Sequence, residues 1–309
     1  MAVIISAVAV ETGGGSSIDQ AAAAAVRAVA AAGSTPEHID ALINTGVYRD
    51  SNMVEPAMSA LIQQAAGIGL EYRSGETPCL SFDLMNGATG VLSAIQVSQA
   101  LLEAPTVRRV VVVSGDAHPS MSPHPVPDFP IKPVGAALVL EKSEQPIGFG
   151  ALHISATDGQ PAATGFVRLA EMGTGGRESI IVDRSGTPVE ELLHHAEHAA
   201  AEALEVAGVS PCEVLLLCGR PTPEFPGLLA ARLGIAADAV CTDDDRYPDD
   251  RTGSGGASFP GDAHTSALPV AYLAARDSGR LERFAVALFV AAGAGPSAAA
   301  ITYRLPAAG

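Results

Sequence analysis

The sequence predicts an α/β protein made of two similar halves, on the basis of three observations. Apolar, strand-like runs alternate with Ala-rich, helix-like stretches along the chain, which is typical of α/β proteins. One pattern of glycine and proline punctuation occurs twice. A strand-like run, residues 79–85, leads through a glycine-containing turn into a helix-like segment, residues 91–103. We divide the chain into an N-terminal half, residues 1–150, and a C-terminal half, residues 151–309.

The composition bounds the size of the core and excludes several classes of function. The chain has 309 residues, of which 48% are hydrophobic, and a chain of this size buries about three quarters of the surface that it exposes when unfolded. A net charge of −16 argues against binding to nucleic acid or anionic membranes through the overall field. It leaves room for a local basic patch that would bind an acidic carrier protein.

Cysteine usage and the apolar runs bear on location. The four cysteines are scattered and imply no disulfide framework. The first residues carry no positively charged segment ahead of their apolar run, so they do not resemble a signal peptide. No apolar run is long enough to span a membrane. We therefore expect a cytoplasmic protein that binds neither membranes nor nucleic acid.

The repeated punctuation indicates a duplication. Gly33 ends an Ala-rich helical stretch and is followed by Pro36 and an apolar run. Gly208 and Pro211 repeat this arrangement 175 residues later. Chance similarity between two Ala-rich segments is the alternative, but shared punctuation at one offset favours duplication.

The same offset aligns Ala88 with Ala263 and Thr89 with His264. A helix-like segment follows each of these positions, and a strand-like run follows each helix. Similar halves usually pack around a pseudo-twofold axis. We therefore expect the helix N-termini near Ala88 and His264 to lie close together.

The turn at residues 86–90 presents one side chain, with its backbone N–H group, at a helix N-terminus. Enzymes place nucleophiles at such turns because the helix dipole and the N–H groups stabilise a developing anion. Here that position holds Ala88, whose methyl group has neither acid–base nor nucleophilic chemistry. The expected catalytic turn therefore lacks a reactive side chain.

The order of these segments resembles the ketosynthase III family of the thiolase-like superfamily over nearly the whole chain. Residues 82–90 are similar to the family's nucleophile turn, in which a Cys would stand at position 88. Residues 56–69 resemble the preceding helix, residues 110–116 the following strand, and residues 293–295 the glycine turn before the last strand. The resemblance implies a thiolase-like fold, five-layered αβαβα from two duplicated halves, usually as a dimer.

The chemistry implied by the resemblance is acyl transfer, with an acyl-CoA or acyl-carrier-protein thioester as substrate and no further cofactor. In the family, the Cys takes the acyl group. A His and an Asn then help to decarboxylate a malonyl unit and stabilise the enolate before carbon–carbon condensation. A backbone N–H group of the C-terminal glycine turn helps to form the oxyanion hole. By position, the resemblance implies that Asn86, Thr89 and Ala294 bind substrate.

Several family positions are altered in this chain. The Cys position holds Ala88, and the nearest match to the family's His is Gly219. The family's Asn corresponds to His264 or Asp262, depending on where a gap is placed. Lys132 begins the segment that replaces a Gly-Asp-Gly turn. Without a thiolate, no acyl-enzyme of the usual kind can form.

Three residues near these positions have alternative interpretations. The hydroxyl of Thr89 is a weak nucleophile without a base, and helix N-capping is its ordinary role. His264 is either a base or hydrogen-bond donor in the pocket, or a polar residue at a helix start. Cys218, next to Gly219, fits a small buried residue at a strand end better than a reactive thiol.

Three functions fit this pattern. The first is a natural cysteine-less subunit that pairs with a Cys-bearing ketosynthase and shapes its pocket or stability, which the loss of several positions favours. The second is a condensing enzyme or acyltransferase in which a native Cys at position 88 was changed to Ala in the laboratory. The third is a stand-alone binder of acyl thioesters. We expect a homodimer or such a heterodimer, with an acyl carrier protein as a further candidate partner.

Other motifs favour structural roles. His194 and His198 lie one helical turn apart without a third ligand nearby, so we expect a solvated helix face and no metal site. The glycine-rich segments 13–17 and 173–177 lack the Lys of a phosphate loop and fit ordinary loops. The acidic segment 243–251 fits a long polar loop, either over the pocket mouth or on the surface.

Overall fold

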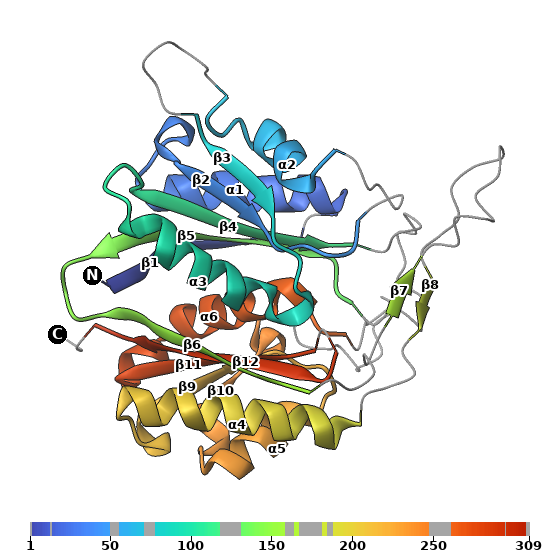
Figure 1. Ribbon diagram of the computed structural model, residues 1–309, viewed down its shortest axis with the longest axis vertical. Helices are drawn as coiled ribbons and strands as arrows, with labels where there is room; N and C mark the ends of the chain where they lie inside the picture. Colours follow the sequence, from blue (N-terminus) through green and yellow to red (C-terminus); the bar gives the residue numbers. More distant parts are fainter. Residues whose placement is uncertain are drawn as a thin grey trace.

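The computed structural model shows helices and sheets in alternating layers (Figure 1). It describes residues 2–12, 14–49, 56–70, 78–117, 131–157, 164–166, 181–183, 188–246, 261–293 and 295–306. The helices are α1 (Ser17–Ala31), α2 (Met58–Ala66), α3 (Gly90–Glu103), α4 (Val189–Ala207), α5 (Phe225–Leu233) and α6 (Ala267–Asp277). Within the described residues, no helix combines the length and the apolar character needed to cross a bilayer.

Two five-stranded sheets separate the helices, one from each part of the chain. The first sheet contains β1 (Ala2–Glu11), β2 (Ala41–Asn44), β3 (Leu80–Asp83), β4 (Arg109–Asp116) and β5 (Val134–Ser143), in the order β1-β5-β4-β2-β3. The second contains β6 (Gly148–Ala156), β9 (Val214–Cys218), β10 (Val240–Cys241), β11 (Val286–Ala292) and β12 (Ser297–Arg304), in the order β10-β9-β11-β12-β6. A separate antiparallel pair is formed by β7 (Thr164–Phe166) and β8 (Ile181–Asp183).

The second sheet, read in reverse, has the same connectivity as the first. β2, β3 and β4 run parallel, as do β9, β10 and β11, and an antiparallel strand follows in each sheet. This correspondence is what a duplication predicts. β6 already belongs to the second sheet at Gly148, and the division of the chain at residue 150 stays a prediction.

The layers follow from the strand sequences. A strand covered on both faces reads as a continuous apolar run, and successive side chains point to opposite faces. In β4, Val110 and Val112 pack into the central cluster with α3 and α6, whereas Val111 and Val113 pack beneath α1 and α2. The second sheet is likewise covered by the central cluster and by α4 and α5. Figure 1 shows the resulting five layers, α1 with α2 at one end and α4 with α5 at the other.

The repeat is confirmed at the ends of the first helix of each half. Gly33 follows α1 and Gly208 follows α4, and both glycines adopt the left-handed backbone conformation, with φ of 65° and 64°. Short 3₁₀ helices, η1 (Pro36–His38) and η5 (Pro211–Glu213), come next in both halves. Glycine fits there because it has no Cβ to clash in this conformation.

The predicted alignment at the later helix starts is wrong by two residues. α3 follows the 3₁₀ turn η3 (Gly87–Thr89), and α6 follows η8 (His264–Ser266). Ala88 therefore corresponds to Thr265, not to Ala263, and Gly87 corresponds to His264. The physical reason is that the second half contains two more residues between its Pro-containing turn and α6 than the first half contains between its own Pro-containing turn and α3.

Helix α1 lies directly on the first sheet at two glycines. A Cβ added to Gly135 would lie 2.4 Å from the carbonyl of Gln20, and a Cβ added to Gly115 would lie 2.5 Å from the carbonyl oxygen of Ser17. We expect Gly135→Ala to lower the free energy of unfolding by about 1–3 kcal/mol, because backbone must move. Denaturant titration measures this. Gly227→Ala in α5, where an added Cβ meets nothing within 4 Å, is the control and should be neutral or stabilising; equal losses would contradict the packing.

Candidate functional site

The turns that precede α3 and α6 pack against each other, which confirms the predicted approach of the two helix N-termini. Each turn begins in the left-handed region, at φ of 52° for Gly87 and 49° for His264. Among the described residues, His264 is the non-glycine residue with positive φ. This conformation is unfavourable for a side chain with a Cβ, so surrounding contacts must hold it.

Ala88 is half-buried at the middle of η3, and the C-terminal glycine turn approaches it closely. A Cβ built on Gly293 would lie 3.5 Å from the Cβ of Ala88. The N–H group of Gly293 donates to the carbonyl oxygen of Ser297 over 3.0 Å. Ala294, expected to bind substrate, lies outside the described residues. The segments that the resemblance brings together therefore do meet at Ala88.

Asp116, at the end of β4, is completely buried and accepts hydrogen bonds from both sides of the site. Its Oδ1 accepts from the backbone N–H groups of Val47 and Tyr48 over 2.8 and 2.7 Å. Its Oδ2 accepts from the Thr265 backbone N–H over 3.3 Å and from the Thr265 hydroxyl over 2.5 Å. Burial alone would raise the pKa of Asp116, but the charge and hydrogen bond of His264 and these donors outweigh it, and the pKa is lowered.

His264 is held by this carboxylate. Its Nδ1 lies 2.9 Å from Oδ2 of Asp116, so with an ionised carboxylate Nδ1 carries a proton. Its backbone N–H donates to Oδ1 of Asp262 over 3.0 Å, and its ring lies 5.3 Å from the ring of Tyr48, centroid to centroid. The imidazole side chain keeps 17% of its area exposed. The sequence singled out His264 but missed Asp116, although an acidic residue ending a buried Val run is a usable signal.

The other residues of the predicted turn have structural contacts. The Thr89 hydroxyl is buried and donates to the carbonyl oxygen of Asn86 over 2.8 Å. It therefore does not cap α3 as predicted, since it bonds backwards to a carbonyl instead of accepting from a helical N–H group. The exposed Asn86 side chain donates to the hydroxyl of Ser93 over 3.1 Å. Both residues stabilise the turn, and their substrate contacts stay a prediction.

Gly219 lies on the other side of the site, after β9. An added Cβ there would lie 3.9 Å from Oδ2 of Asp262, and the Gly219 N–H group donates to the carbonyl of Val290 over 3.1 Å. The position therefore faces the site without offering a functional group. The neighbouring Cys218 is buried, and burial raises the pKa of its thiol, which confirms the interpretation of an inert core residue.

Several solved structures that this fold resembles are 3-oxoacyl or β-ketoacyl synthases. The 3-oxoacyl-(acyl carrier protein) synthase III of Pseudomonas aeruginosa matches with a TM-score of 0.80 at 17% identity, covering 99% of both chains. The β-ketoacyl-acyl carrier protein synthase III of Thermus thermophilus matches with a TM-score of 0.70 at 21% identity, covering 93% of this chain and 84% of that one. A priming β-ketosynthase from a polyketide biosynthetic pathway matches with a TM-score of 0.74 at 18% identity, covering 100% and 97%.

The chain has the thiolase-like fold of the ketosynthase III enzymes. No protein-family model matches it, and no curated protein matches it in sequence. At these identities the likeness establishes the predicted fold alone. The chemistry of the site therefore has to be argued from the residues that this chain carries.

A buried charged cluster lies beside Asp262. Arg220 donates through Nε to Asp243 over 3.0 Å and through Nη2 to Asp244 over 2.6 Å. Lys132 donates to Asp244 over 2.7 Å and lies 3.5 Å from Asp243. Asp243 is completely buried, so the surface alternative predicted for segment 243–251 is wrong at this residue, and residues 247–251 lie outside the described residues. Lys132 stands where the resemblance predicts a Gly-Asp-Gly turn. Its ammonium group pairs with Asp243 and Asp244, because buried carboxylates need cationic partners.

Asp262 is a third carboxylate beside these two cations. Burial, together with the negative charge of Asp243, raises the pKa of Asp262 to about 7. Its two oxygens accept from the backbone N–H groups of Arg220 and His264, over 3.2 and 3.0 Å. A carboxyl group with a pKa of about 7 changes charge near neutral pH.

We expect Asp262→Asn to raise the free energy of unfolding more at pH 8 than at pH 5. The pKa of Asp262 is raised to about 7 in the folded state, from about 4 in the unfolded state. The free energy of unfolding of the wild type therefore falls as the pH rises from about 4 to about 7. Asn stays neutral, and its amide oxygen can still accept from His264. Urea titrations at both pH values measure the difference, with the exposed Asp238→Asn as control. A gain independent of pH would contradict this assignment.

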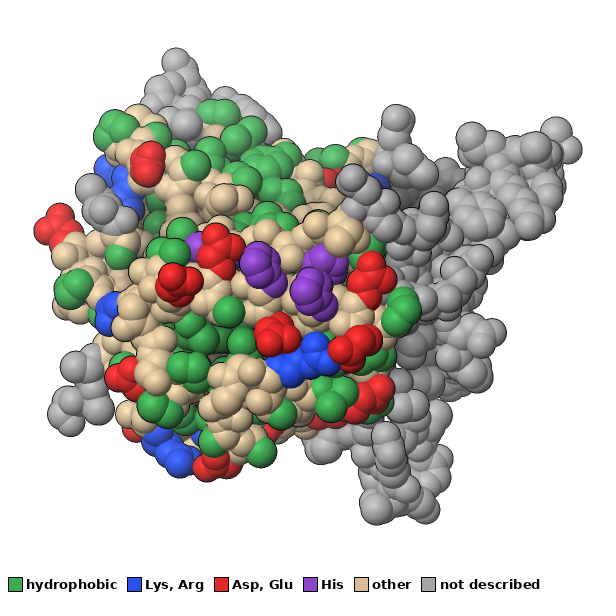
Figure 2. Space-filling model, turned by 60° about the horizontal axis from the view of Figure 1, so that its bottom comes forward, with side chains coloured by type: hydrophobic (Ala, Val, Ile, Leu, Met, Phe, Trp, Pro, Cys, Tyr) green, Lys and Arg blue, Asp and Glu red, His purple; other side chains and the backbone are tan. Residues whose placement is uncertain are grey.

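Two of the three histidines of α4 lie on the surface, whereas His195 is buried against Ser155. His194 and His198 are exposed, and Figure 2 shows histidine side chains grouped on the outer face of the molecule. In the part of the chain that the structure describes, no group of three or more His, Cys, Asp or Glu residues is arranged to hold a metal ion. The face presented by His194 and His198 is solvated, as predicted.

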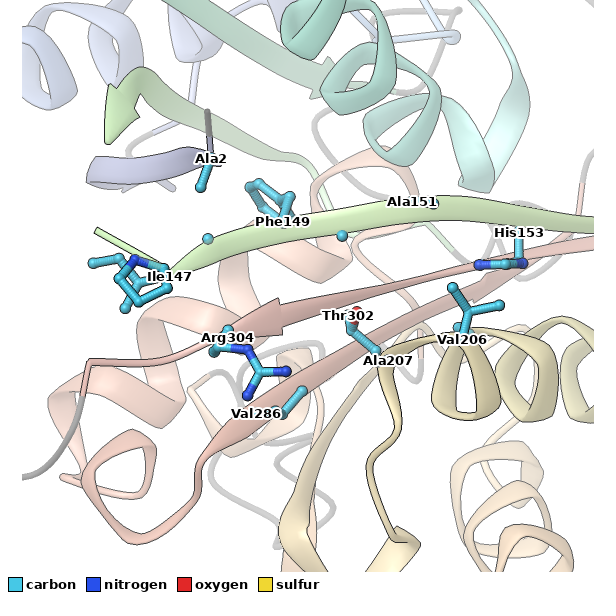
Figure 3. Close-up of a pocket in the computed structure, with 14 residues that line it drawn as sticks. Ala2, Ile147, Phe149, Ala151, His153, Val206, Ala207, Val286, Thr302 and Arg304 are labelled. Carbon is cyan, nitrogen blue, oxygen red and sulfur yellow. The ribbon is translucent and has the colours of Figure 1, made fainter. Parts of the chain in front are cut away.

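A hollow of about 250 Å³ opens where β6 and β12 meet the end of α4 (Figure 3). Its lining includes Phe149, His153, Val206 and Arg304. None of the residues around Ala88 lines it. The hollow is therefore separate from the site formed by the two helix starts.

Proposed function

We propose that this chain acts in acyl-thioester condensation or acyl transfer as a cysteine-less partner of a Cys-bearing ketosynthase. Its ligand would be an acyl-CoA or acyl-carrier-protein thioester, with no further cofactor. In the complex it shapes or stabilises the active pocket of the other subunit. The likeness of fold to synthase III enzymes supports the class of chemistry, and the residues of this chain support the absence of an acyl-enzyme.

One observation carries this proposal. The chain keeps the turn, the helix start and the glycine approach at Ala88, while both positions expected for the reactive pair hold residues without functional groups. Ala88 stands where the resemblance expects the nucleophile, and Gly219, where it expects the His, lies next to Asp262. A single laboratory substitution would account for Ala88 alone. Two altered positions therefore favour a natural cysteine-less subunit over an engineered variant.

The edge of the first sheet offers a surface for the partner subunit. β3 lies at the end of the strand order. Leu80 at its start and Met85 just beyond it expose 54% and 53% of their surfaces. Edge strands with exposed apolar side chains readily pair with another chain. A dimer built across β3 would place the turn of Ala88, which follows directly, near the interface.

Reconstitution tests the proposal. A Cys-bearing ketosynthase from the same source is assayed for condensation product with and without this chain. We expect the rate or the distribution of product lengths to change when the chain is added, and no product from the chain alone. Unchanged products, or condensation by this chain in isolation, would contradict the partner role. Stabilisation of the isolated chain by acyl-CoA, without effect on a ketosynthase, would favour a stand-alone thioester binder.

A further inference from the structure

The Asp116–His264 pair is chemistry that the partner role does not require. Asp116 is completely buried, ends a core strand and lies 2.9 Å from Nδ1 of His264. A carboxylate on Nδ1 fixes the ring orientation and the tautomer, so that Nε2 is the basic nitrogen. It also stabilises the imidazolium that forms when Nε2 takes a proton. A subunit that only shapes a partner needs neither property.

The backbone at His264 points to the same requirement for an imidazole. The equivalent position of the first half is Gly87, which adopts a φ of 52° without steric cost. His264 adopts 49° with a Cβ present, which costs of the order of 1 kcal/mol. Asp262, Asp116 and Thr265 hold this segment in place. The second half therefore keeps a strained conformation at the residue that carries the basic side chain.

The surroundings of the pair suit an acyl group without an enzyme nucleophile. η8 packs against η3, which holds Ala88 and opens the 14-residue helix α3. N–H groups at a helix start stabilise an oxyanion. The Ala88 methyl group, 3.5 Å from the added Cβ of Gly293, cannot attack a thioester. For a thioester bound here, the attacking atom would come from a second substrate.

We propose that His264, positioned by Asp116, is a general base for direct acyl transfer from a thioester to the hydroxyl group of a small molecule. The acceptor O–H gives its proton to Nε2 while its oxygen bonds to the thioester carbonyl carbon. The tetrahedral oxyanion collapses, the C–S bond breaks, and the leaving thiolate takes the proton back from the imidazolium. The products are an ester and a free thiol, and no acyl-enzyme forms.

The acceptor class follows from the strength of the base. A thiol ionises appreciably near neutral pH without help, whereas a hydroxyl group needs a positioned base. An Asp–His pair is the arrangement that activates hydroxyl groups in hydrolases. This activity belongs to the isolated chain, so it goes beyond the proposed partner role and can fail without affecting it.

The test uses the isolated full chain, butyryl-CoA as donor and a series of simple primary and secondary alcohols as acceptors. Free CoA is followed with a thiol reagent, and the ester by mass spectrometry. We expect His264→Asn to lower the rate at least 100-fold, as for loss of a general base. Asn tolerates the left-handed backbone, so the variant should fold. The matched control is His194→Asn on exposed α4, which should keep the full rate.

A pH profile separates positioning from a structural role. In the part of the chain that the structure describes, the charged and titratable groups that contact His264 include Asp116 from β4, Asp262 before η8, and Tyr48. In the wild type the rate should fall in acid as the imidazole becomes protonated. In Asp116→Asn that fall should move to lower pH, because the carboxylate that favours the protonated ring is lost. No ester formation above background, or a His264→Asn variant with the wild-type rate, would overturn the proposal.

Discussion

Asp116→Ala is expected to lower the free energy of unfolding by about 3–5 kcal/mol, as for removal of a buried, fully bonded charge. The substitution strands the backbone N–H groups of Val47, Tyr48 and Thr265, the Thr265 hydroxyl, and Nδ1 of His264. These donors come from two separate parts of the chain. Losing the carboxylate should therefore loosen the contact between the loop after β2 and the start of α6. Denaturant unfolding at pH 7 measures the loss.

The pH dependence of this loss has a definite sign. The pKa of Asp116 is lowered in the folded state, so its stabilisation is fully present above the unfolded value of about 3.9 and disappears as pH falls toward the folded value. The difference between wild type and Asp116→Ala should therefore shrink in acid. Asp277→Ala, which removes two surface ion pairs, with Arg246 and Arg276, is the control and should cost about 0–1 kcal/mol per pair. An Asp116→Ala loss as small as that control would contradict the assigned network.

Condensation activity is expected only when Ala88→Cys and Gly219→His are combined. A thiol at position 88 would stand at a helix start, where the dipole favours a thiolate. Position 219 faces the same site, with an added Cβ 3.9 Å from Asp262, so an imidazole there could orient against that carboxylate. The product from acyl-CoA and a malonyl thioester, measured by mass spectrometry, should appear above background with the double variant.

The single variants define the alternatives for this restoration. Ala88→Cys alone should give no condensation product, because Gly219 offers no imidazole. Condensation by Ala88→Cys alone would show instead that the site lacks only the thiol. That result would support the alternative in which a native Cys was replaced in the laboratory. Gly219→His alone should be inactive.

The sequence predicted the architecture because the architecture depends on local patterns. Runs such as Val110 to Val113 identify strands covered on both faces. Gly33 and Gly208 mark helix ends that only glycine adopts easily. From these features the α/β class, the two similar halves and the meeting of the two helix starts could be predicted correctly. The five-layered arrangement is implied by the resemblance to the ketosynthase III family.

The site could be predicted only in part, because its remaining features are tertiary. Two extra residues in the second half shifted the alignment, so His264 was matched to Thr89 when the structure matches it to Gly87. The role of Asp116 depends on loops that the sequence separates by about 70 and 150 residues. The burial of Asp243 depends on Arg220 and Lys132. No local pattern carries such pairings.

The mass of the complex purified gently from its native source tests the central claim most directly. Native mass spectrometry of the tagged chain should give a hetero-complex whose other subunit carries Cys at the turn where this chain carries Ala88. Incubation with acyl-CoA should add an acyl mass to that subunit and none to this chain. A homodimer as the only species, with no Cys-bearing ketosynthase bound, would contradict the account.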